Sequence, residues 1–335
     1  EALRSSRSTP ESPHSRRTLA RYPFATRPTA SQILPRLSRY GESVSFPSAA
    51  RQARGHRPVG YVVAAVLAAL LAFAAAGGIF VFAVRTSVGQ VIDQRLLEYG
   101  RELPAASQVP HWLSMSVVSN PLTWIVGAAI VVGFVLLGAV LPSERGTRGV
   151  GSRIATTAAL LLFPPVTIII VRALRDGTYR PHFHDWIEET NNSAPSGHAA
   201  AIAALVVAVT LAAPPLLRPW IAAVGGTWAA IIDFGLVAAG WHRPSDVAIS
   251  TLLIVGAGIL LPDPHRGSTT VIPRIAGLGV SALIVVAASV TVAVYYPRIE
   301  QVVIAALVAA VVGVCVGILV AFKSGDRCLL YTSDA

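Results

Sequence analysis

The chain has 335 residues, of which 53% are hydrophobic and 13% charged, and its mean hydropathy is +0.61. A soluble domain of this length is far less apolar, so the composition excludes a soluble globular protein and indicates an integral membrane protein. Most of the net charge of +10 lies in one segment, because residues 1–58 alone carry eleven arginines against three glutamates.

This N-terminal segment, residues 1–58, is rich in Arg, Ser and Pro and has no apolar periodicity. Such a sequence cannot bury enough surface to fold, so we predict a disordered, solvated tail with some attraction for anionic lipids. We expect no nucleic-acid partner. The only methionine is Met115, and an upstream read-through would account for the tail.

Eight apolar segments follow, and crossing a bilayer takes about 20 such residues. Their ranges are 59–84, 121–141, 154–171, 199–217, 220–239, 247–261, 272–294 and 302–322. We therefore predict an all-α, polytopic transmembrane helical bundle, in which residues 59–261 form a six-span core and residues 262–322 add two helices. The sixth segment is short at 15 residues, and Pro164-Pro165 should kink the third.

The C-terminal residues 323–335 are predicted to be an artefactual tail. The stretch from Cys328 to Ala335 resembles the translation of a common sequencing-library adapter, and we exclude it from the fold. The other cysteine, Cys315, lies in an apolar run and is expected only to pack.

The loop between the first two spans, residues 85–120, carries charged residues in a helical pattern. We predict an interfacial or lid-like segment near the functional site.

Most polar groups suited to chemistry lie in residues 172–198, between the third and fourth spans. Ser196 is placed to cap the helix that follows, and Gly197 leaves its first backbone N–H groups accessible. The helix dipole adds partial positive charge there, so the sequence predicts an anion site with His198 in the first turn.

A second polar stretch, residues 241–246, precedes the sixth span, and Pro244 suits a first helical turn. His242 and Asp246 are four residues apart, so the carboxylate can reach one ring nitrogen and leave the other as a nucleophile or base. Counting membrane crossings places both polar stretches on the same side, opposite the N-terminus.

The orientation follows from the basic residues. Lys and Arg number 19 on the N-terminal side and 8 on the site side, although without the eleven arginines of the tail the count is 8 against 8. Because cytoplasmic loops are enriched in these residues, we expect the site on the extracytoplasmic face.

The two polar stretches resemble motifs of the type 2 phosphatidic acid phosphatase superfamily, whose members carry three short motifs around a six-helix core. The middle motif is matched by Pro195-Ser196-Gly197-His198, the third motif ends in His242 and Asp246, and the first ends in Arg180-Pro181. Their order relative to the spans also agrees, so the resemblance covers the first six spans.

The resemblance implies that His242 attacks phosphorus to form a phosphohistidine, that Asp246 holds its ring, and that His198 protonates the leaving oxygen. Arg180 and the Ser196-Gly197 backbone would bind the phosphate oxygens. Phosphoryl transfer needs an in-line nucleophile, an acid opposite it and fixed positive donors. We therefore expect neither a metal nor a cofactor.

Two cations of the family pattern are missing. The lysine of the first motif falls on Ala173, and we expect Arg172 or Arg175 to replace it from a neighbouring register. The Ser-Arg pair of the third motif falls on Gly235-Leu236, where Arg243 is the predicted substitute. Loss of one positioned cation costs on the order of 10² to 10³ in rate, by analogy with an oxyanion donor.

Asp233 lies about 9 Å inside the fifth span at 1.5 Å per residue, where an ionised group is costly. One hypothesis pairs it with Arg172 or Arg175, and the alternative is a protonated or solvated packing residue.

A histidine-containing run in the first polar stretch also hints at metal ligands, namely His182, His184, Asp185, Glu188 and Glu189. The binuclear hydrolase pattern that it resembles needs an aspartate where Trp186 stands, so solvated loop residues or headgroup contacts are favoured.

We therefore predict a phosphatase of the bacterial plasma membrane that cleaves a lipid phosphate or diphosphate. Heavy use of Ala, Val and Arg with one Lys suggests a GC-rich bacterial source and favours polyprenyl substrates such as undecaprenyl diphosphate. Membrane lipids are the expected surroundings, and the oligomeric state is left open. The alternatives are a weakened or inactive lipid-phosphate-binding protein and a transporter with a histidine proton relay.

Overall fold

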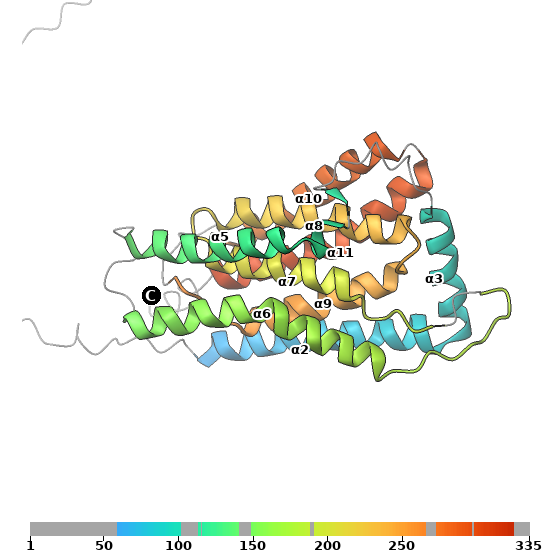
Figure 1. The fold of residues 1–335 in the computed structure, drawn as a ribbon, viewed down its shortest axis with the longest axis horizontal. Coiled ribbons are helices and arrows are strands. Elements are labelled where there is room, and N and C mark those ends of the chain that lie inside the picture. The colour runs from blue at the N-terminus through green and yellow to red at the C-terminus, as the bar shows by residue number, and fades with distance from the viewer. Residues whose placement is uncertain are drawn as a thin grey trace, which may run out of the picture. The chain divides into compact units, whose positions relative to one another are not determined.

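A computed structural model describes residues 59–101, 113–114, 116–140, 149–187, 191–265, 273–296 and 298–324. Within these ranges every regular element is helical, and the protein is the predicted all-α polytopic bundle (Figure 1). The tail predicted for residues 1–58 lies outside the described residues. Of the tail predicted for residues 323–335, Lys323 and Ser324 instead belong to the last described helix, and residues 325–335 lie outside the described residues.

The helices follow the apolar segments predicted from the sequence. In chain order they are α2 Val59–Arg85, α3 Ser87–Gly100, α4 Ser116–Ser119, α5 Pro121–Val140, α6 Val150–Asp176, α7 Gly197–Ala212, α8 Arg218–Ala238, α9 Pro244–Leu260, α10 Pro273–Tyr295 and α11 Ile299–Ser324.

Six of the described helices, α2, α5, α6, α8, α10 and α11, are long and apolar enough to cross a membrane, so the protein is an integral membrane protein. Helices α7 and α9, at the fourth and sixth predicted spans, are shorter apolar helices of 16 and 17 residues. Helix α7 ends at Ala212 because Ala213 is extended ahead of Pro214, and a residue before proline is disfavoured in the α-helical conformation.

The short helix α7 lies within the bundle, in contact with α5, α6, α8 and α9. Nearly all its residues after His198 are buried, and many are alanines, whose small side chains let neighbouring helices approach closely. At Gly258 of α9 the approach is so close that a Cβ would lie 2.6 Å from Val207 of α7. Protein rather than lipid therefore surrounds α7.

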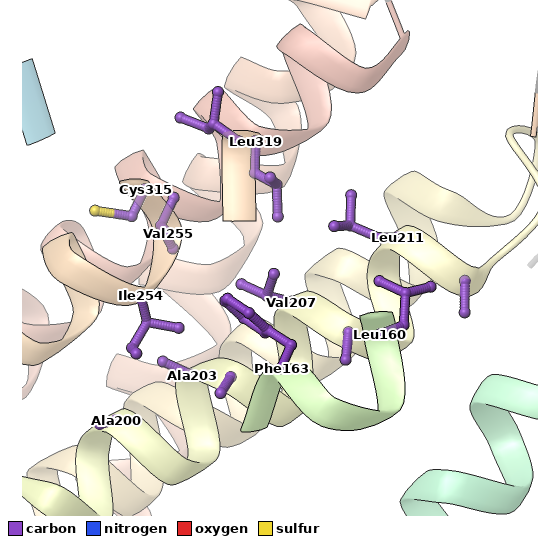
Figure 2. Packing of buried hydrophobic residues seen from close by; sticks show 14 of the residues in the cluster. Leu160, Phe163, Ala200, Ala203, Val207, Leu211, Ile254, Val255, Cys315 and Leu319 are labelled. Carbon is purple, nitrogen blue, oxygen red and sulfur yellow. The ribbon is translucent and has the colours of Figure 1, made fainter. Parts of the chain in front are cut away.

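The main apolar core draws buried residues from six of the described helices, α2, α5, α6, α7, α9 and α11. Figure 2 shows Phe163 of α6, Val207 of α7 and Ile254 of α9 converging with Cys315 and Leu319 of α11. Cys315 is buried in this cluster, in agreement with its predicted packing role. Helices α10 and α11 pack on each other and on α8. The two helices beyond the predicted six-span core therefore share its interior.

Helix α3 runs crosswise at one end of the bundle, where α2 ends and where the chain passes from α6 to α7 and from α8 to α9 (Figure 1). It packs against α8, α9 and α11. The described part of the predicted lid-like segment, residues 85–120, comprises this helix and the residues around the short α4, while residues 102–112 and 115 lie outside the described residues.

A buried ion pair ties the chain together at the opposite end. Arg218 donates to both carboxylate oxygens of Asp263, over 2.9 and 3.0 Å, and to the carbonyl of Lys323 over 3.0 Å. The Lys323 ammonium in turn donates to the carbonyl of Leu261 over 2.7 Å. The start of α8, the segment after α9 and the end of α11 are thus joined by charge-assisted hydrogen bonds.

We predict that Asp263→Asn lowers the free energy of unfolding by about 3–5 kcal/mol, because it leaves the buried Arg218 charge uncompensated. Denaturant titration in detergent micelles measures this loss. The matched control is Glu98→Gln, which breaks an exposed pair with Arg95 and should cost less than about 1 kcal/mol. Equal losses in the two variants would contradict the prediction.

Candidate active site

The two histidines singled out from the sequence meet at the α3 end of the bundle. His198 lies in the first turn of α7 and His242 lies just before α9, and their ring centroids are 6.0 Å apart. The Trp241 ring lies 5.6 Å from that of His198. The structure therefore brings the second and third motifs into one site, as the crossing count predicts.

A tight turn after α8 presents His242. The backbone N–H groups of Trp241 and His242 both donate to the carbonyl of Leu236, over 3.0 and 3.3 Å. Gly240 has a φ of 73°, a conformation that glycine adopts without steric cost. Arg101, after α3, lies so close that a Cβ at Gly240 would be 2.6 Å from its Nε. The backbone conformation thus favours glycine here, and a larger residue would also displace the Arg101 side chain.

Asp246 lies behind His242 and has no exposed surface. Its Oδ2 is 3.6 Å from Nδ1 of His242, and it accepts hydrogen bonds from the Ser193 hydroxyl over 2.6 Å and the Arg243 N–H over 3.0 Å. These donors favour the ionised carboxylate. The arrangement directs Nδ1 of His242 toward Asp246, as the four-residue spacing predicts.

Backbone contacts join the middle and third motifs. The Ser196 N–H donates to the carbonyl of Asp246 over 3.2 Å, and the Ser250 hydroxyl donates to the carbonyls of both residues over 2.9 Å. The Ser196 hydroxyl accepts from the N–H of Ala199 over 3.2 Å, which is the predicted N-cap. The Ser196 N–H is therefore engaged within the fold, whereas Gly197 begins α7 itself.

The predicted phosphate-binding arginines are placed differently from one another. Arg172 lies against Gly197, where a Cβ would be 3.6 Å from the Arg172 Nε. Arg175 donates to Asp176 over 2.9 Å, in an exposed pair. Burial and, after it, the charges of His242, Arg172 and Arg175 lower the pKa of His198. Arg180 is buried in the loop between α6 and α7.

Arg243 is buried and held by α3. Its Nε and Nη2 both donate to Oε1 of Gln94, over 3.2 and 3.0 Å, and its Nη1 lies 3.5 Å from the Ser193 hydroxyl. The predicted substitute for the missing third-motif cation therefore lies beside Ser193 and Asp246. Its role in phosphate binding stays a prediction.

Sequence reasoning missed how deeply α3 takes part in this site. Gln90, Asp93 and Gln94 are all buried on the face of α3 that also buries Leu97. Polar residues at spacings of three and four, followed by a leucine on the same face, were the available signal. That pattern indicates a polar helix face turned toward protein.

Asp93 reaches across to the start of α9. Its carboxylate accepts hydrogen bonds from the N–H of Ser245 over 3.1 Å and from the Ser245 hydroxyl over 2.5 Å. Burial and, secondly, the charge of Asp246 raise the pKa of Asp93 from an ordinary 3.8 to about 6, although Ser245 and Arg243 oppose the shift. Asp93 thus titrates close to neutral pH beside the site.

The loop that follows α6 is fastened at two places. Asn192 donates to the carbonyls of Arg175 and Ala194, over 3.1 and 2.9 Å, and so joins the loop to the end of α6. Gln90 of α3 donates to the carbonyl of Pro181 over 2.7 Å. Both ends of the segment that contains Arg180 are therefore anchored.

The histidine-containing run in the loop after α6 was considered above as a possible set of metal ligands. In the described residues no three acidic, histidine or cysteine side chains gather closely enough to hold a metal ion, and Glu188 and Glu189 lie outside those residues. His184 instead bonds to the Ser87 hydroxyl over 2.8 Å, and His182 lies 3.7 Å from Asp185.

The predicted pairing of Asp233 with Arg172 or Arg175 is wrong. Asp233 is fully buried in α8, and neither carboxylate oxygen has a hydrogen-bond partner among the described residues. Both arginines lie instead at the end of α6, a helix that packs against α5 and α7. The alternative, a packing residue, stays a prediction.

Comparison with known proteins gives one match. A family model described as PAP2 superfamily matches residues 169–263, which contain all three motifs and confirm the resemblance predicted from them. No curated protein and no solved structure matches the chain. Members of this superfamily are generally phosphatases.

We predict that Asp93→Asn reduces the pH dependence of stability. The folded state binds the Asp93 proton more tightly than the unfolded chain, so this contribution is complete below pH 3.8 and is lost as the pH rises through about 6. Thermal unfolding in detergent measures this: between about pH 5 and about pH 8, the unfolding temperature should fall less in the variant than in the wild type. Glu98→Gln, an exposed carboxylate on the same helix, should keep the wild-type difference. An unchanged difference in Asp93→Asn would refute the prediction.

Proposed function

We propose that the protein, in which residues 169–263 form a PAP2 superfamily segment, is a membrane phosphatase that hydrolyses the phosphate or diphosphate ester of a lipid. One observation carries this proposal. Two imidazoles from separate helices lie 6.0 Å apart between ring centroids, and a buried carboxylate stands behind one of them. That separation suits an attacking group and a proton donor on opposite sides of one phosphorus atom.

In the proposed first step, Nε2 of His242 attacks phosphorus while the ester oxygen leaves. His198 gives its proton to that oxygen, so the lipid departs as an alcohol, or as a monophosphate if the substrate is a diphosphate. In the second step, a water molecule attacks the phosphohistidine. His198 takes the proton from this water, and inorganic phosphate and both free histidines are regenerated.

Asp246 supports both steps from its fixed position. Its Oδ2 lies 3.6 Å from Nδ1 of His242. In the proposed reaction it therefore orients the ring with Nε2 toward the substrate and stabilises the positive charge that the ring gains on phosphorylation. Because the Ser193 hydroxyl and the Arg243 N–H already hold this carboxylate, the ring needs little reorganisation during the reaction.

We assign the binding of the negatively charged phosphate to the arginines and to the start of α7. Arg172 lies against Gly197 at the start of α7, and we assign its guanidinium and the first N–H groups of that helix to the same phosphate. Arg175, Arg180 and Arg243 are the other proposed donors. This set replaces the lysine and arginine missing from the family motifs, and the proposed chemistry requires no metal.

A site at the end of a membrane bundle favours substrates whose chains remain in the bilayer. Phosphatidate, phosphatidylglycerol phosphate and polyprenyl phosphates or diphosphates meet this condition. We favour a polyprenyl diphosphate at the extracytoplasmic face of a bacterial plasma membrane, on the basis of the residue usage and the distribution of basic residues.

The test is turnover of these lipids by purified protein in detergent, with trapping of acid-labile phosphate on the enzyme. His242→Ala should form no phosphoenzyme and lose at least about 10³-fold in rate, because the nucleophile is gone. His198→Ala should lose about 10² to 10⁴-fold on lipid substrates. Its loss should be much smaller on an aryl phosphate, because a phenolate leaves without protonation.

Other outcomes identify the alternatives. Tight binding of a lipid phosphate by an inactive wild type would indicate a binding protein, and transport of unaltered lipid would indicate a transporter. Activity that EDTA abolishes would overturn the metal-free mechanism.

A further inference from the structure

Helix α3 makes direct polar contacts to the segment that carries the candidate nucleophile, although it lies outside the PAP2 superfamily match at residues 169–263. It crosses the end of the bundle beside the start of α9 (Figure 1). Two adjacent side chains, Asp93 and Gln94, make these contacts, and both are at least 95% buried.

Gln94 binds the guanidinium of Arg243 through a single amide oxygen. The Nε and Nη2 donors converge on Oε1 over 3.2 and 3.0 Å, which fixes the plane of the guanidinium. The third nitrogen, Nη1, then lies 3.5 Å from the Ser193 hydroxyl, and that hydroxyl donates to Asp246. Gln94 thus sets the direction of the Arg243 guanidinium beside Ser193.

Asp93 joins α3 to the start of α9, close to the contact between Gln94 and Arg243. It accepts from both the N–H and the hydroxyl of Ser245, in the first turn of α9. Arg243 and Asp246 lie two residues before and one residue after this anchor. The register between α3 and α9 is therefore fixed beside Gln94.

The chemical type of residue 94 matters as well as its position. A neutral amide orients the guanidinium without adding negative charge. The surroundings of Arg243 already include the carboxylates of Asp93 and Asp246. A third carboxylate there would offset the positive charge that a phosphate needs.

We propose that Gln94 is a positioning residue for phosphate binding, which aims Arg243 at the substrate while leaving its charge available to the phosphate. This inference rests on the proposed phosphatase function.

The experiment compares Gln94→Leu, Gln94→Glu and the wild type on a lipid monophosphate and a lipid diphosphate. Gln94→Leu removes the acceptor and should lower kcat/KM by about 10- to 100-fold, the range expected for a hydrogen bond to a charged group. Gln94→Glu keeps an acceptor oxygen but adds a charge. It should raise KM by roughly 10-fold, and more for the diphosphate, whose charge is greater.

Two further measurements separate positioning from a structural role. In an Arg243→Met background, Gln94→Leu should have almost no additional effect, because Gln94 acts through Arg243. The control Glu98→Gln changes an exposed residue of the same helix and should stay within about twofold of the wild type.

A wild-type KM in Gln94→Glu would reduce Gln94 to a structural contact and overturn the inference. So would additive effects of Gln94→Leu and Arg243→Met, or a Gln94→Leu rate close to that of the wild type. In each of these cases the phosphatase function itself stands. A wild type that neither turns over lipid phosphates nor forms a phosphoenzyme would overturn both proposals.

Discussion

The candidate site depends on the burial of one carboxylate. Asp246 has no contact with solvent, so its negative charge has to be compensated by donors from the protein. Ser193 supplies a hydroxyl from the loop before α7, Arg243 supplies a backbone N–H, and His242 supplies a ring nitrogen nearby. The carbonyl of the same residue receives the N–H of Ser196. The contacts to this single residue therefore join the middle and third motifs.

Much of this arrangement could be predicted from the sequence, because it depends on local patterns. The length of the apolar segments predicted the membrane helices. The number of crossings between the two polar stretches predicted that His198 and His242 lie at the same end of the bundle. The spacing of four residues between His242 and Asp246 predicted their contact. Ser196 capped α7 as expected, since N-capping depends only on residues within one turn.

The contacts that could not be predicted depend on how helices pack. Nothing local to α3 says that Gln94 meets a residue 149 positions away. The pairing proposed for Asp233 failed because depth in the bilayer does not determine which neighbouring helix a residue faces. The short length of α7 was missed because the apolar run continues through Pro214-Pro215, although the helix ends before them.

The packing of α11 into the shared interior affects the order in which the protein is assembled. Leu319 and Cys315 fill space between α6, α7 and α9, all of which emerge earlier from the ribosome. Until α11 has been inserted, that interior is incomplete and Arg218 lacks its bond to the Lys323 carbonyl. The contacts of α11 with α6, α7 and α9 can therefore form only after those three helices have been made.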